Sequence, residues 1–130
     1  MSNARFEIFF DPDAAKEYEA LDNSVCEIVD KSIEELEIRA DEVGKPLGNK
    51  QNGKLVGCKE IKLRTAGIRI IFKVTKEIVH VLCVVYILTI EKRSNDFVFK
   101  VADKRYSKMQ INPLNQITKG RHWKKKGSHD

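Results

Sequence analysis

The sequence predicts an α+β domain in which an N-terminal helical hairpin and a C-terminal helix pack on an antiparallel β-sheet. Apolar residues recur at helical spacing until about residue 43, and from Cys58 they alternate with polar residues as in half-buried strands. Another helical pattern follows the last of these strands, as expected when helices are segregated from a sheet. With 130 residues, the chain can form one hydrophobic core but not two independent ones.

The first strand and the first helix are predicted at the N-terminus. Arg5–Phe10 reads RFEIFF, a short run of aromatic and branched residues that is typical of a strand. Asp11 is expected to be the N-cap of the following helix, and Pro12 suits its first position. The apolar residues that then recur at helical spacing are Ala14, Ala15, Tyr18 and Leu21.

A second helix is predicted from Ser24 to Val43. Ser24 and Glu27 have the spacing of a capping box, and Gly44 supplies a C-terminal stop. One stripe of the helix is apolar and the rest is acidic, so we expect it to pack against the first helix as an antiparallel hairpin. The stripe consists of Val25, Ile28, Val29, Ser32, Ile33, Leu36, Ala40 and Val43.

The sheet is predicted to follow a basic connection over residues 45–57, which contain Pro46 and three glycines. One strand starts at Cys58, a second covers Ile68–Val74 after a turn, and a third covers the apolar run Ile78–Ile90. Because the third run is apolar on both faces, it should be the central strand. His80 within it is expected to be a buried imidazole rather than a catalytic one.

The last predicted helix starts with Ser94 as its cap and ends near Tyr106. The compact domain therefore covers residues 1–106. Residues 107–130 contain a Lys-Lys-Lys run and little periodicity, so they are expected to form a weakly ordered basic extension. His122 and Trp123 in this extension could contact RNA, or the extension could simply be a flexible basic tail.

Composition and charge restrict the class of protein. Charged residues make up 33% of the chain and hydrophobic residues 42%, which is typical of a folded soluble protein. The three cysteines form no CxxC pair, so we expect no zinc site or disulfide framework, and no secretory or membrane segment is evident. These features favour a cytoplasmic protein without a metal or other cofactor.

The charge is distributed unevenly along the chain. Residues 1–43 hold 4 Lys+Arg against 13 Asp+Glu (net −9), residues 44–106 hold 14 against 5 (net +9), and residues 107–130 hold 6 against 1 (net +5). A one-sided basic surface attracts phosphate backbones or acidic protein segments. The alternative is that these charges only solubilise ordinary helices and strands.

Cations are predicted to gather on one face of the sheet that no helix covers. Alternation places Ile61 and Leu63 in the core and directs Lys62, Arg64 and Arg69 to the opposite face. Clustered cations repel one another unless an anion neutralises them, so we expect a phosphate to bind there. On an exposed face, Arg69→Ala should leave folding intact.

Residues 54–105 resemble the RelE/ParE superfamily of type II toxin–antitoxin toxins, more closely on the RelE side. The resemblance lies in KLVGCKEIKLRTAGIRIIFKV, in the later EKR and in VFKVADKR. It implies a toxin that enters the ribosomal decoding site and cuts the bound mRNA without a metal, with the 2′-hydroxyl of the RNA as nucleophile. The implied partners are a cognate antitoxin protein, the ribosome and mRNA, and no membrane.

The resemblance also implies roles for individual residues. Lys62 would be a base or an electrostatic stabiliser, Arg69 would bind the transition-state phosphate, and Arg93 would stabilise the leaving group. Glu60 stands where some members have a lysine, and it either acts as the general base or pairs with Lys62. Further residues implied in RNA binding are Lys54, Lys59, Arg64, Lys92 and Phe99.

Two other functions fit the same residues. Phe99 falls where RelE-type members commonly have a tyrosine, and a phenyl ring can stack on a base but cannot donate a proton. A ParE-like inhibitor of DNA gyrase and a non-enzymatic nucleic-acid-binding domain therefore remain alternatives to an mRNA endoribonuclease. Either Tyr106 or a residue of the tail could replace the missing hydroxyl.

Overall fold

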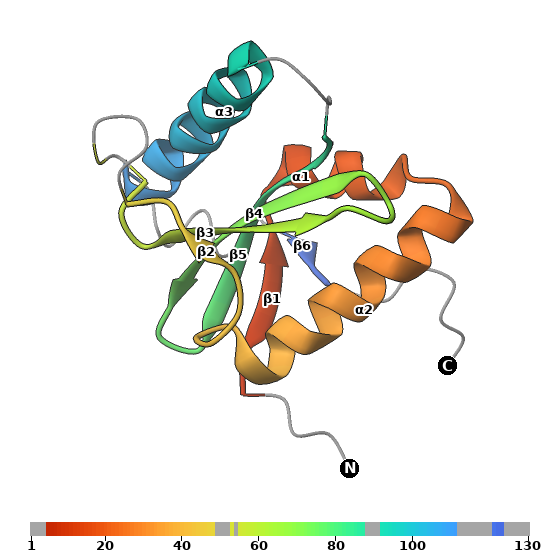
Figure 1. Ribbon diagram of the computed structural model, residues 1–130. Helices are drawn as coiled ribbons and strands as arrows, with labels where there is room; N and C mark the ends of the chain where they lie inside the picture. Colours follow the sequence, from red (N-terminus) through yellow and green to blue (C-terminus); the bar gives the residue numbers. More distant parts are fainter. Residues whose placement is uncertain (1–4, 49–52, 54, 88–91, 112–120, 124–130) are drawn as a thin grey trace.

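The computed structural model describes residues 5–48, 53, 55–87, 92–111 and 121–123, without the side chains of 92–96, 109–111, 121 and 122 (Figure 1). In this part of the chain the strands form one mixed sheet of order β2-β3-β4-β5-β1-β6. The elements are β1 (Glu7–Phe10), α1 (Pro12–Glu19), α2 (Asn23–Arg39), β2 (Lys45–Pro46), β3 (Cys58–Leu63), β4 (Ile68–Thr75), β5 (Ile78–Tyr86), α3 (Lys92–Ile111) and β6 (Arg121–His122).

The caps of the two N-terminal helices show how the sequence starts each helix. The carboxylate of Asp11 accepts hydrogen bonds from the backbone N–H groups of Asp13 and Ala14, which confirms the predicted N-cap of α1. In α2 the cap is Asp22 and not Ser24, because the Asp22 carboxylate accepts from the backbone N–H of Val25. The Ser24 hydroxyl instead donates to Asp22.

The helix α2 ends earlier in the sequence than the apolar stripe predicted. The helix ends at Arg39 with Ala40 as its C-cap, and Gly44 follows with a φ of 92°. A Cβ atom at Gly44 would lie 3.0 Å from the ring of Phe72, so glycine suits both the left-handed conformation and the close approach. Val43 packs against the core from a turn instead of from the helix.

The predicted meander of β3, β4 and β5 is antiparallel, but β1 pairs with β5 in parallel, so the sheet is mixed and not purely antiparallel. Alternation along a strand carries no information about direction. A parallel neighbour requires a long crossover, and α1, α2 and the β2–β4 segment provide that crossover between β1 and β5.

The two faces of the sheet are covered by different helices, as Figure 1 shows. The helices α1 and α2 pack on one face, the hairpin face, and α3 packs on the other, the α3 face. We expected the second face to be uncovered, and this is wrong because β4 and β5 carry apolar residues on both faces. Ile70 and Phe72 belong to the hairpin-face core, whereas Ile71 and Leu82 belong to the α3-face core.

A β-bulge in β5 changes which residues face each core. Ile71 pairs with Cys83 and Phe72 pairs with Val81, so Leu82 is an extra residue in the ladder. Leu82 and Cys83 therefore both face α3.

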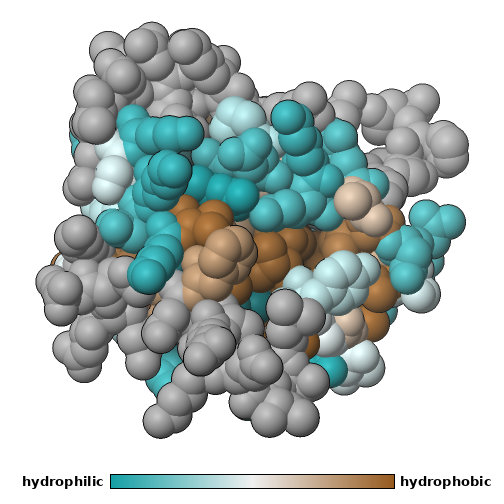
Figure 2. Space-filling view, turned by 90° about the horizontal axis from the view of Figure 1, so that it is seen from above, coloured by the Kyte–Doolittle hydropathy of each residue, from teal (hydrophilic) through white to brown (hydrophobic). Residues whose placement is uncertain are grey.

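Seen from above, apolar residues form a band on the surface with hydrophilic residues beside it (Figure 2). Large hydrophobic residues that stay exposed in the described ranges are Ile38, Val56, Tyr86 and Phe97.

The C-terminal third differs from the prediction in two ways. The last helix does not end near Tyr106 but continues to Ile111. Residues 121–123 are not a weakly ordered extension, because β6 pairs with β1 and Trp123 is buried in the hairpin-face core. No helix in the described ranges is long and apolar enough to cross a membrane.

Candidate functional site

The pairing of β3 with β4 brings two of the predicted site residues together. Lys62 and Arg69 are directly opposite each other in the ladder, and Glu60 is two residues from Lys62 on the same face of β3. All three belong to the α3 face of the sheet, together with Ile71. The Lys62 side chain is exposed, whereas Glu60 and Arg69 are buried.

Arg69 does not lie on an open surface, and this corrects the expectation that it is exposed. Its side chain is only 5% exposed, and its Nε atom lies 2.8 Å from Oε1 of Glu60, which is also 5% exposed. The two atoms form an ion pair without the alignment of a hydrogen bond. Glu60 therefore pairs with Arg69 and neutralises it, whereas the sequence suggested Lys62 as its partner.

The helix α3 covers this ion pair with an aromatic ring. The guanidinium carbon of Arg69 lies 5.7 Å from the centre of the Phe99 ring, which is the geometry of a cation–π contact. Further along α3, the Tyr106 ring centre lies 5.2 Å from Nζ of Lys73. Phe99 is 7% exposed, so its ring packs on Arg69 and is not presented to a base in this conformation.

The other residues implied in RNA binding lie in different places. Lys59 lies on the hairpin side of β3, where its Nζ donates to the carbonyl oxygens of Ala40 at 3.3 Å and Asp41 at 3.0 Å, beyond the carboxyl end of α2. Arg64 is exposed in the turn after β3.

The side chains of the remaining predicted residues are not described. Lys54 lies outside the described residues altogether. Lys92 and Arg93 are in the first turn of α3, but their side chains are likewise outside what the structure describes.

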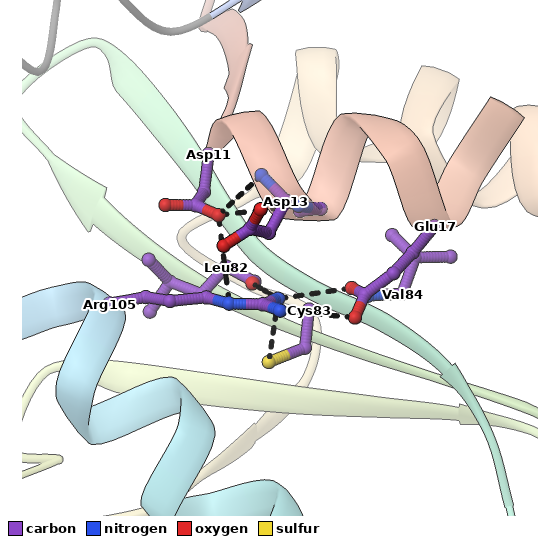
Figure 3. A network of polar contacts seen from close by, with 8 residues as sticks. Asp11, Asp13, Glu17, Leu82, Cys83, Val84 and Arg105 are labelled. Carbon is purple, nitrogen blue, oxygen red and sulfur yellow. Dashed lines mark hydrogen bonds and ion pairs between the residues drawn. The ribbon is translucent and has the colours of Figure 1, made fainter.

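Arg105, which is part of the VFKVADKR segment of the last helix, is a central residue of this region. Figure 3 shows its guanidinium reaching from α3 to α1 and β5. It donates to both carboxylate oxygens of Glu17, at 3.0 and 3.1 Å, and to the carbonyl oxygen of Leu82 at 2.6 Å. Its Nε also lies 3.6 Å from Oδ2 of Asp11.

These contacts compensate for the short length of β1. The strand β1 ends at Phe10, so the part of β5 beyond Val81 has no pairing from it. Along that part, Arg105 donates to the carbonyl of Leu82 and the Glu17 carboxylate accepts from the backbone N–H of Val84. Side chains thus satisfy backbone groups that a longer strand would have paired.

Several groups in the Arg105 network have shifted pKa values. Burial acts to lower the pKa of Arg105, but the hydrogen bond to Glu17 and the nearby acidic groups outweigh it, so the pKa is raised. Burial raises the pKa of the Asp11 carboxyl and raises that of the Cys83 thiol to about 12. Arg105 is therefore a fixed cation that holds α3, and with it Phe99, at a defined position.

His80 is buried, as predicted, on the α3 face of the sheet. It is 6% exposed, and its Nε2 lies 3.0 Å from the Thr75 hydroxyl oxygen. Burial lowers the pKa of His80, and the positive charge of Lys73 opposite it in the ladder lowers it further. The imidazole is thus held neutral at pH 7.

A groove of about 550 Å³ runs between α2 and the outer edge of β3. The short strand β2 pairs only with Lys59 and Glu60, so no described strand pairs with the edge at Ile61–Leu63. The groove is lined by Ile28, Lys31, Ser32, Glu35, Val43, Gly44, Glu60, Ile61, Lys62 and Leu63. Among the described residues, no group of three or more His, Cys, Asp or Glu residues could hold a metal ion.

The chemistry available at the site follows from this arrangement. An exposed ammonium group on Lys62 lies next to a guanidinium that is buried and already paired with Glu60. Lys62 can contact a phosphate from solvent as the protein stands. Arg69 can do so only if α3 moves or if the phosphate displaces Glu60.

Comparison with solved structures finds the E. coli toxin RelE. A doubly substituted mutant of this toxin in the free state is 29% identical, with a TM-score of 0.57, and the match covers 78% of this chain and 97% of that chain. The isolated toxin is 26% identical, with a TM-score of 0.54, over 75% of this chain and 99% of that chain. A chain of the intact E. coli RelBE toxin–antitoxin complex is 32% identical over 62% of this chain and 94% of that chain, with a TM-score of 0.44. No protein-family model matches, and no curated protein matches.

Proposed function

We propose that this chain, whose fold is similar to that of the E. coli toxin RelE, is the toxin of a type II toxin–antitoxin system and cleaves mRNA in the ribosome. The observation that carries the proposal is the direct pairing of Lys62 with Arg69 across β3 and β4 in a RelE-like fold. Two cations opposite each other are unfavourable in a sheet unless an anion lies between them or near them. Glu60 supplies that anion in the free protein, and an RNA phosphate would supply it in the complex.

In the proposed reaction the 2′-oxygen of the RNA attacks the adjacent phosphorus. The bond from phosphorus to the 5′-oxygen breaks, which leaves a 2′,3′-cyclic phosphate and a 5′-hydroxyl end. Lys62 stabilises the charge on the phosphate, and Glu60, once released from Arg69, accepts the 2′-hydroxyl proton. Arg69, released with it, binds the phosphate oxygens, and Arg93 stabilises the leaving 5′-oxygen, which takes its proton from solvent water. No metal takes part in this scheme.

A second candidate function is RNA binding without cleavage. The observation that favours it is that Glu60 already neutralises Arg69 in a buried ion pair, whereas the proposed reaction requires both groups to be released. In addition, Phe99 has no hydroxyl to donate to the leaving oxygen. A protein of this kind would bind RNA through Lys62 and Arg64 and leave it intact.

The test compares two exposed lysines. Brief induction of the wild-type chain should stop growth and produce new mRNA 5′ ends within translated regions, in register with codons. Lys62→Met should abolish both effects, whereas Lys16→Met, on an exposed position of α1, should leave them unchanged. Growth arrest with intact mRNA would contradict cleavage. RNA binding in vitro with no arrest would favour the second candidate, and DNA damage with translation intact would favour gyrase inhibition.

The proposed partner is a cognate antitoxin that carries acidic groups. Lys62 near the end of β3 and Arg64 in the turn after it are both exposed, and an acidic segment would complement them and compete with RNA. Co-expression of the gene that neighbours this one should restore growth. The charge-reversal variant Arg64→Glu should weaken the complex, as measured by calorimetry, and Lys16→Glu serves as its control.

A further inference from the structure

Residues 121–123 lie against the outer edge of β1. In β6, His122 pairs with Phe9 and Arg121 pairs with Phe10, in antiparallel direction. The backbone N–H of Trp123 then donates to the carbonyl oxygen of Ile8 at 2.8 Å. The Trp123 side chain is 9% exposed and belongs to the hairpin-face core. Residues 121–123, which we call the edge cap, therefore cover the positions Ile8–Phe10 of β1.

Other backbone groups of the β1 segment are paired without the edge cap. The N–H groups of Arg5 and Phe6 donate to the carbonyl oxygen of Glu37 in α2, and the N–H of Asp11 donates to that of Val81. The inner side of β1 pairs with β5. The outer edge at Ile8–Phe10 is thus the part of β1 that depends on the edge cap.

The two edges of the sheet differ in how they avoid pairing with another chain. At the opposite edge, β2 carries Lys45 and Pro46, and the part of β3 beyond it carries Lys62; both charged residues and proline oppose strand addition. The β1 edge at Ile8–Phe10 reads IFF, with no charge and no proline. Such an uncovered edge is a template for a further strand.

We propose that the edge cap occupies a strand-addition site in cis, and that a second copy of this chain binds the same site through its own β1 when the cap is absent. The direction of β6 shows that the edge accepts an antiparallel strand. Two β1 strands paired antiparallel can be related by a two-fold axis, so the same residues of both copies form one closed interface. Removal of Trp123 also uncovers apolar surface of the hairpin-face core beside that edge.

The experiment measures molar mass by light scattering over a range of protein concentrations. All chains carry Lys62→Met, so that the proposed toxicity does not limit expression and the readout does not depend on it. The full chain and a chain that ends at Trp123 should be monomers, since both keep the edge cap and differ only in the basic run after it. A chain that ends at Gly120 should have twice the monomer mass.

A second variant decides the case in which the shortened chain precipitates. Phe9→Lys in the chain that ends at Gly120 places a charge on the uncovered edge, and it should restore a soluble monomer. If the chain that ends at Gly120 is a monomer, the proposal is wrong. It is equally wrong if Phe9→Lys leaves the dimer or the precipitate unchanged, because the contact would then not involve β1.

Discussion

The two faces of the sheet are built from different chemistry. On the hairpin face, the buried sheet residues are apolar, and they are Ile8, Phe10, Ile68, Ile70, Phe72, Val79, Val81 and Val84. On the α3 face, apolar residues such as Ile71 and Leu82 are mixed with the buried polar residues Glu60, Arg69 and His80. A buried charge costs free energy unless it is paired, whereas a buried apolar side chain is stabilising.

This difference indicates a division of roles between the two faces. The hairpin face provides most of the stability of the fold, and the α3 face retains costly polar groups that a purely structural core would not need. Two of those groups, Glu60 and Arg69, are residues to which the family resemblance assigns chemistry. The comparison can be tested by changing one face at a time and measuring the free energy of unfolding.

The largest expected loss comes from the hairpin face. Phe72 is fully buried, so Phe72→Ala removes a large apolar side chain and leaves a cavity that should cost about 4 kcal/mol. Denaturant unfolding of the purified protein measures this directly. The conservative control Ile71→Val, on the other face, should cost about 1 kcal/mol. Equal losses from the two variants would contradict the division between the faces.

The next largest effect concerns the buried ion pair. Arg69→Met leaves Glu60 buried without its partner, and this should cost about 3 kcal/mol. The double variant Glu60→Leu with Arg69→Met removes both charges and should recover most of that loss. This replaces the expectation from sequence that Arg69→Ala leaves folding intact. A double variant as unstable as the single one would show that the ion pair is not the source of the loss.

A smaller effect depends on pH and on His80. Its pKa in the folded protein is below the ordinary value of 6.5, so the folded state binds the proton less readily than the unfolded state. The contribution to stability is present above pH 6.5 and is lost as the pH falls from there towards the folded pKa. Unfolding curves measured across this range should show the decrease. In His80→Gln the free energy of unfolding should fall less as the pH is lowered. If it falls as steeply as in the wild type, other groups cause the pH dependence.

The smallest effect on stability is expected at the exposed cation. Lys62→Met should change the free energy of unfolding by no more than about 0.5 kcal/mol, because the side chain is exposed. The melting curve of this variant therefore separates a loss of activity from a loss of folding. A large destabilisation would mean that Lys62 has a structural role on the α3 face.

Local rules predicted the elements better than their arrangement. Asp11 and Pro12 predicted the start of α1 because capping depends on neighbouring residues. The alternation after Cys58 predicted in the same way that Lys62 and Arg69 lie on one face of the sheet. The parallel direction of β1 and the side of the sheet that α3 covers depend on contacts between distant parts of the chain, and neither the apolar pattern of β1 nor that of α3 contains them.

The face of the sheet on which Arg69 lies was predicted, but its burial was not. Alternation assigns Arg69 to a face, but it does not say whether a helix covers that face. The signal that could have indicated the cover is the apolar Ile71 between Arg69 and Lys73, because strands covered on both sides carry apolar residues on both faces. The partners of Arg105 were not predicted for a related reason, since Glu17 and Leu82 are far from it in the chain.

The β-bulge at Leu82 determines which side chains of β5 point to each face of the sheet. Side chains before and after it follow the same alternation with opposite phase, so one residue more or fewer between Val81 and Val84 would exchange the inward and outward sets for the rest of β5. The carbonyl that Arg105 contacts is at this same position. An insertion or deletion of one residue at this point would therefore move the apolar side chains of the following part of β5 to the opposite face of the sheet.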